Sequence, residues 1–73
     1  MHWIKIRRGN ITNLEVLGLS SDNKIAIGYI FTTINKDGSH EYSIGDGKGN
    51  YYLDHTTHFI LSRDLVKLKK NIE

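Results

Sequence analysis

The chain has 73 residues with a net charge of +2 and contains neither cysteine nor proline. A chain of this length buries only about 60% of its unfolded surface, so we expect a single domain, 1–73, with a small core. The absence of cysteine excludes disulfides, thiolate metal sites and a catalytic thiol, and it favours a reducing, cytoplasmic setting. No apolar run approaches the roughly 20 residues that cross a bilayer, so we expect no membrane association.

The N-terminal segment, residues 2–8, alternates in polarity and predicts a first β-strand. Trp3, Lys5 and Arg7 would share one side of this strand. Gly9 and Asn10 follow as a turn signal.

Residues 14–34 consist of two apolar, β-branched-rich runs around a short polar cluster, which is typical of a β-hairpin. A loop of two or four residues would place Val16 opposite Tyr29, whereas a three-residue loop would shift the register and exchange the faces of one strand. We favour the even lengths, because they gather large apolar side chains on one surface. This predicted core surface comprises Leu14, Val16, Ile25, Ile27, Tyr29 and Phe31.

The second strand of this hairpin, residues 25–34, is apolar on both of its faces. Such a strand is usually interior to a sheet or covered on both sides. Gly28 in its middle predicts a bend or a bulge.

Asp37-Gly38 is the strongest local hairpin signal in the chain. A two-residue turn at this dipeptide would place Phe31 opposite Ile44 and Thr33 opposite Tyr42. The two predicted turns therefore agree on the same core surface.

The end of the chain changes from strand to helix periodicity. After a predicted strand over residues 51–61, Ser62 is a good N-cap, and Leu65, Leu68 and Ile72 recur at helical spacing. The predicted fold class is mainly β: a five-stranded antiparallel meander over residues 2–61, bent into a small SH3-like barrel or half-barrel, with a short amphipathic C-terminal helix over residues 63–72.

The glycine-rich segment 45–50 fails the tests for a phosphate or calcium loop. It lacks a P-loop signature, Asn50 stands at the third glycine of G-x-G-x-x-G, and Lys48 stands where a calcium loop needs an oxygen ligand. We therefore expect a strand connection there and no cofactor.

His55 and His58 would point to opposite faces of a strand, which disfavours a shared metal site, and no thiolate can complete one. No nucleophile motif is present, so we do not expect an enzyme. A metal-free ribonuclease that uses a lysine with His40, His55 or His58 needs no motif and stays an alternative.

Positive charge is concentrated at both ends of the chain, whereas the middle is acidic, a distribution that suits an anionic partner or a simply solvated surface. Trp3 could stack on a base while Lys5 and Arg7 meet phosphates; alternatively, Trp3 is buried against the C-terminal helix with the cations around it. The candidate binding residues are Trp3, Lys5, Arg7, Lys48, Lys67, Lys69 and Lys70.

These features predict a small non-enzymatic binding protein, an accessory or inhibitor protein that docks on a protein or nucleoprotein partner. The abundance of isoleucine, lysine and asparagine is typical of AT-rich genomes such as those of many bacteriophages. The alternative is a single-stranded RNA- or DNA-binding β-protein that uses Trp3, Lys5, Arg7 and the basic C-terminal helix. An open edge strand would also allow a homodimer.

Overall fold

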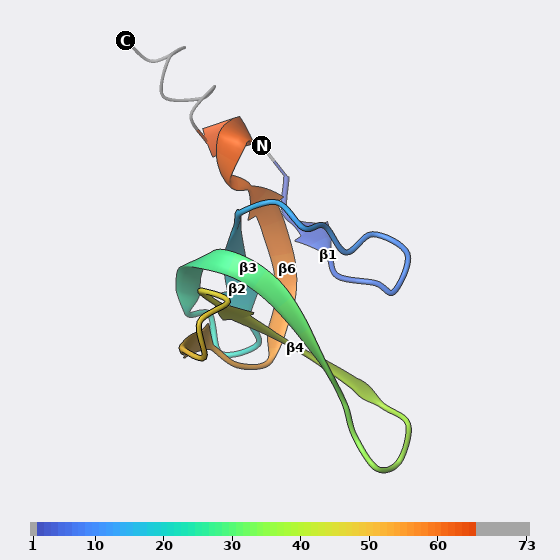
Figure 1. The fold of residues 1–73 in the computed structure, drawn as a ribbon. Helices are drawn as coiled ribbons and strands as arrows, with labels where there is room; N and C mark the ends of the chain where they lie inside the picture. Colours follow the sequence, from blue (N-terminus) through green and yellow to red (C-terminus); the bar gives the residue numbers. More distant parts are fainter. Residues whose placement is uncertain (1, 66–73) are drawn as a thin grey trace, which may run out of the picture.

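Six strands form one antiparallel sheet in the computed structural model, which describes residues 2–65. The strands are β1 (Ile4–Lys5), β2 (Val16–Ser20), β3 (Ile25–Ile34), β4 (His40–Gly45), β5 (Tyr51–Leu53) and β6 (Thr56–Leu61). Their order in the sheet is β1-β6-β2-β3-β4-β5 (Figure 1). The mainly β class is therefore confirmed.

The predicted five-stranded meander is wrong near both ends. The expected strand over residues 51–61 is divided into β5 and β6 at Asp54 and His55, where His55 has a φ of 53°. After this turn β6 enters the sheet between β1 and β2, so the first strand does not pair with the second. Because β1 and β5 are the two outer strands and do not pair, the sheet is not closed and an SH3-like barrel is not confirmed.

A short helical turn, residues 62–65, follows β6 (Figure 1). Ser62, the predicted N-cap, instead donates its hydroxyl to Glu15 Oε1 at 2.8 Å and its N–H to the Glu15 carbonyl at 3.0 Å. The start of the helical turn is thus tied to the segment before β2. The rest of the predicted helix over residues 63–72 lies outside the described residues.

Both central hairpins turn through three residues, and this reverses the predicted register. At the first hairpin, the Ser20 N–H donates to the Lys24 carbonyl at 2.9 Å, and Asn23 takes a left-handed φ of 66°. At the second, the Asn35 N–H donates to the Ser39 carbonyl at 2.8 Å, and Gly38 has a φ of 86°. A three-residue loop with a left-handed third residue is a common hairpin connection.

Side chains of the flanking residues hold both of these loops. The Ser20 hydroxyl donates to Asp22 and accepts the Lys24 N–H, and Ser39 donates its hydroxyl to Asp37 at 2.6 Å. These hydroxyl donors are the main reason that the pKa of each aspartate is held below its ordinary value of 3.8. The turn residues therefore satisfy one another locally, which stabilises the odd loop length.

The shifted register puts the opposite face of β3 in the core. Val16 pairs with Gly28 instead of Tyr29, and Ile44 pairs with Ile30 instead of Phe31. The predicted core surface is therefore correct for Val16 but wrong for Leu14 and for Ile25, Ile27 and Tyr29 on β3, which are exposed.

The strand β3 changes partner at its middle, as the glycine there predicts. Residues 25–28 pair with β2 and residues 29–34 pair with β4, and the strand curves strongly between the two parts (Figure 1). This bend folds the two halves of the sheet toward each other. Beyond this bend, the end of the β3–β4 hairpin projects away from the rest of the sheet as an arm (Figure 1).

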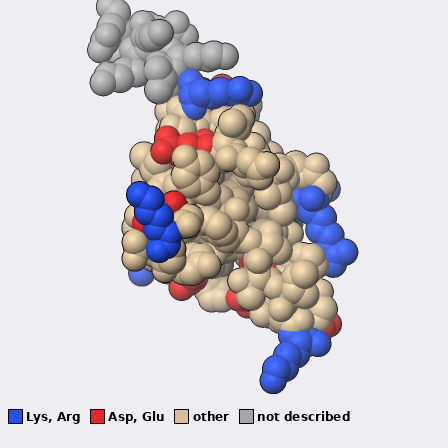
Figure 2. All heavy atoms as spheres, viewed as in Figure 1, with Lys and Arg blue, Asp and Glu red and all other residues tan. Residues whose placement is uncertain are grey.

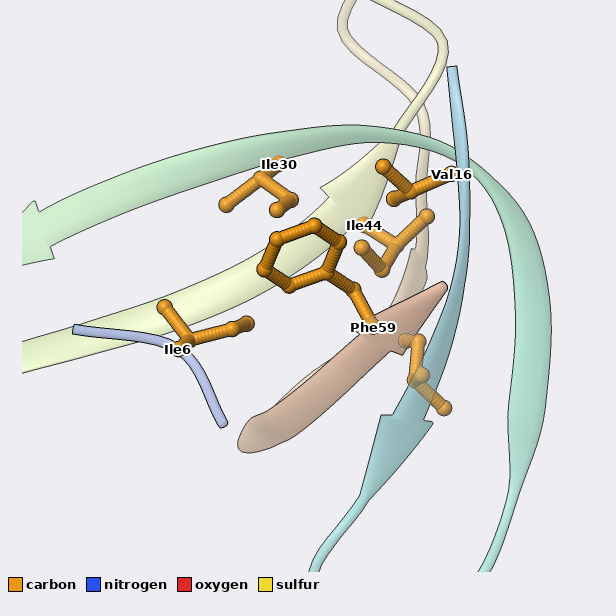
Figure 3. Close-up of a cluster of buried hydrophobic side chains, with 6 residues drawn as sticks. Ile6, Val16, Ile30, Ile44 and Phe59 are labelled. Carbon is orange, nitrogen blue, oxygen red and sulfur yellow. The ribbon is translucent and has the colours of Figure 1, made fainter. Parts of the chain in front are cut away.

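The core fills the angle between the two halves. Phe59 lies among side chains from the segment just after β1 and from β2, β3 and β4 (Figure 3). The cluster comprises Ile6, Val16, Ile30, Ile44, Leu53 and Phe59. Ile44 and Val16 are fully buried at its centre.

Two glycines on the inner face let β2 and β3 approach Ile44 closely. A Cβ on Gly18 would lie 2.5 Å from Ile44 Cγ1, and a Cβ on Gly28 would lie 2.6 Å from the Gly45 carbonyl oxygen. Side-chain atoms do not occur at such separations, so larger residues at either position would push the sheet halves apart.

We therefore expect Gly28→Ala to lower the free energy of unfolding by about 1–3 kcal/mol, because the added methyl overpacks against backbone that cannot easily move. Gly9→Ala is the matched control, since a Cβ there meets no atom within 4 Å; it should change stability by less than about 0.5 kcal/mol. Urea unfolding of both variants measures the difference. Equal stability of the two variants would contradict this packing.

Candidate docking face

The outward face of the sheet is apolar where β6, β2 and β3 lie side by side. Leu17 pairs with Ile27 on one side and with Ile60 on the other, and Leu19 pairs with Ile25 and with His58. Directly paired residues point to the same side of a sheet. Since Gly18 and Val16 face the core, these pairs face outward.

Exposure on this face increases from β6 across β2 to β3. Ile60 is buried, whereas Ile27 is 54% exposed, Ile25 is 60% exposed and Tyr29 is 41% exposed. Leu17 and Leu19 are half-buried beside them. We call the set of Leu17, Leu19, Ile25, Ile27 and Tyr29 the outer patch. Adjacent large apolar side chains at this exposure are typical of surfaces that bind another molecule.

The Asn10 side chain occupies backbone hydrogen-bonding groups at the free edge of β1. The Asn10 carboxamide donates to the Lys5 carbonyl at 2.7 Å and accepts the Arg7 N–H at 2.8 Å. These are backbone groups that a neighbouring strand would otherwise use. The face of the sheet is therefore more accessible to a partner than this edge.

Three of the predicted binding residues lie around β1. Trp3 is 39% exposed, and Lys5 and Arg7 are exposed as well. Trp3 is thus not buried within the described residues. Lys67, Lys69 and Lys70 lie outside the residues that the structure describes.

Positive charge does not form a continuous surface on the side of the molecule shown in Figure 2, where basic side chains stand apart from one another. Lys48, the remaining candidate, is exposed in the 45–50 loop, beyond β4 and away from β1 in the strand order. The structure therefore brings Trp3, Lys5 and Arg7 together on one segment but leaves Lys48 separate.

The 45–50 loop is organised around the carboxylate of Asp46. This group accepts the Lys48 N–H at 2.7 Å, the Asn50 N–H at 3.2 Å and the Asn50 side-chain amide at 2.8 Å. The Asn50 amide is the main reason that the pKa of Asp46 lies below its ordinary value. Because an internal anion occupies these donors, the loop is poorly suited to hold a phosphate.

Two of the histidines line one open hollow of about 280 Å³. Lys5, His40 and His55 line it together with Tyr42. His58 lies elsewhere, on the outward face, with its Nδ1 2.8 Å from Thr57 Oγ1. The alternative of a metal-free ribonuclease would thus involve His40 and His55 without His58.

Among residues 2–65, no three histidine or carboxylate side chains lie close enough together to hold a metal ion. In the same part of the chain, no helix has the length and apolar character required to cross a membrane.

Comparison with known protein families, with curated proteins and with solved structures finds no match for this chain.

The outer patch is the functional candidate that the sequence analysis missed. Three of its residues, Ile25, Ile27 and Tyr29, were assigned to the core because an even-length loop would gather them with other large apolar side chains on one surface. The sequence signal for this patch was that residues 25–34 are apolar on both faces, because burying both faces of such a strand requires other residues to pack over each of them. The structure supplies the inner cover from its own core and leaves the outer face of β3 exposed.

Proposed function

We propose that this chain is a small non-enzymatic binding protein that docks through the outer patch on an apolar surface of a larger protein. The observation that supports this proposal is the exposure of Ile25, Ile27 and Tyr29 at alternate positions of one strand, on the same face. An accessory or inhibitor role fits such a chain, because occupying a partner's surface requires a recognition face and no catalytic group. Its isoleucine-, lysine- and asparagine-rich composition suits a bacteriophage origin.

The energetics favour apolar docking over ionic docking. Covering the exposed half of one isoleucine side chain contributes on the order of 1 kcal/mol. The two exposed isoleucines are neighbours of half-buried Leu17 and Leu19, so one apolar partner surface can cover all four together. Binding of this kind should persist at high salt, where ionic contacts are screened.

Affinity capture tests the proposal with matched threonine substitutions, which keep β-branching while removing apolar surface. Ile27→Thr should weaken capture of a partner protein from lysate of the source organism about fivefold, and Ile25→Thr with Ile27→Thr more strongly. Ile34→Thr is the control, because Ile34 is 67% exposed but lies on the projecting arm. Quantitative mass spectrometry of the eluates at high salt measures the three variants against the wild type.

A partner that is retained equally by the double variant, or lost equally with Ile34→Thr, would contradict docking through the outer patch. Circular dichroism of each variant confirms that the comparison is made between folded proteins.

A second candidate function, binding of single-stranded nucleic acid, is favoured by the exposure of Trp3 beside Lys5 and Arg7. An exposed indole can stack on a base while adjacent cations meet the phosphates. The scattered basic side chains in Figure 2 make this a smaller contact than a continuous basic groove would give.

For this second function, Trp3→Ala should reduce affinity for a fluorescently labelled oligonucleotide by about 1–3 kcal/mol, the typical contribution of one stacked base. Tyr52→Ala is the control, because Tyr52 is an exposed aromatic on β5. Fluorescence anisotropy across a salt series measures both variants, and affinity should fall as salt rises. Absence of binding at low salt, or equal loss in both variants, would rule this function out.

A further inference from the structure

We infer that two copies of this chain associate face to face through the outer patch when no other partner occupies it. The inference rests on the proposed docking face and names one occupant of it, a second copy of the chain.

The arrangement of side chains suits the packing of one sheet on another. Two adjacent rows cross the patch, with Leu17 opposite Ile27 and Leu19 opposite Ile25. Sheets pack face to face when such alternating apolar side chains interdigitate between layers about 10 Å apart. A second copy presents the same alternating pattern, and a two-fold axis through the patch makes the contact closed and isologous.

The charges on the outward face also suit an apolar partner. None of the outward-facing paired residues of β6, β2 and the first part of β3 carries a fixed charge; the nearest paired residue that does is Lys5, which pairs with His58 and lies on the outer strand β1. Two other strands, β6 and β2, separate it from β3. A pair centred on Leu17 and Ile27 therefore buries no charged group, whereas a phosphate-rich partner would find no cation within the patch.

The size of the patch sets the strength of this association. A fully exposed large side chain has an accessible area on the order of 200 Å², so the partly exposed side chains of the patch together have about 400 Å² per copy. A dimer that covers both patches and the residues around them would bury roughly 1,000 Å² in total. Interfaces of this size are weak and exchange readily. Self-association would therefore cover the patch reversibly and leave it open to competition by a tighter partner.

The closed β1 edge makes the alternative mode of pairing less favourable. An edge-to-edge dimer through β1 would have to displace the Asn10 carboxamide from the Lys5 carbonyl and the Arg7 N–H. Face-to-face association displaces only water from apolar side chains.

Sedimentation velocity of the full chain, from about 1 µM to about 500 µM, tests the inference. Wild type and Ile34→Thr should pass from monomer to dimer over this range. An isologous interface contains Ile27 twice, so a loss of about fivefold per contact becomes a loss of about 25-fold in the dimerisation constant of Ile27→Thr. The variant that combines Ile25→Thr with Ile27→Thr should stay monomeric throughout.

Methyl NMR spectra recorded on dilution of the wild type locate the interface. Shifts confined to Leu17, Leu19, Ile25 and Ile27 support it, and shifts confined to the projecting arm around Ile34 overturn it. A wild type that is monomeric at every concentration, or a double variant that still dimerises, also overturns the inference.

The outcomes separate this inference from the proposed function. A monomeric wild type that loses its captured partner on Ile27→Thr substitution overturns self-association and leaves docking intact. The opposite result is that Ile27→Thr dissociates the dimer while capture of the partner protein is unaffected. That result supports self-association and contradicts docking on a larger partner through the outer patch.

Discussion

The close packing of Gly18 and Gly28 around the fully buried Ile44 determines how this sheet is folded. Because a Cβ on either glycine would collide with Ile44 or with the Gly45 carbonyl, both glycines must stand on the inner face. Alternation along β3 then places Ala26 and Ile30 inside and Ile25, Ile27 and Tyr29 outside. The close packing at Gly28 lies where β3 changes its pairing partner from β2 to β4. This one contact therefore accounts for the bend, the core and the exposed outer patch.

The distribution of apolar residues follows from this geometry. The inner face of β3 carries the small residues Ala26 and Gly28 where the strand packs against Ile44 and Gly45, so the large isoleucines of this part of the strand, Ile25 and Ile27, occupy the outer face. A stable small domain would normally place such residues inside. Here the space around Ile44 is filled by Ile6, which follows β1, and by side chains of β2, β3, β5 and β6, and the outer face of β3 stays exposed. The proposed docking and the proposed self-association would use the same side chains, so the strength of each would limit the other.

Much of this fold could be predicted from the sequence, although the register could not. The hairpins around Asp22 and Asp37, the interior position of residues 25–34 and the bend at Gly28 are confirmed. The register was wrong because each turn was assigned an even number of residues, while Asn23 and Gly38 supply the left-handed third residue of a three-residue loop. The predicted loop was wrong by one residue at each turn, so the two faces of β3 were exchanged relative to both β2 and β4. The two predicted turns therefore still agreed on one core surface, and their agreement did not reveal the error.

The placement of β6 between β1 and β2 depends on long-range pairing that local sequence patterns do not report. For the candidate site, the exposure of Lys5 and Arg7 follows from their charge, whereas the outer patch could be identified only once the register was known.

Cross-strand nuclear Overhauser effects test the register of β3, on which the core, the bend and the outer patch all depend. We predict contacts between Leu17 and Ile27 and between Phe31 and Ser43, the pairs that the three-residue loops produce. Contacts between Gly18 and Ile27 and between Phe31 and Ile44 would instead indicate even-length loops. That result would return Ile25, Ile27 and Tyr29 to the core and would contradict the existence of the outer patch.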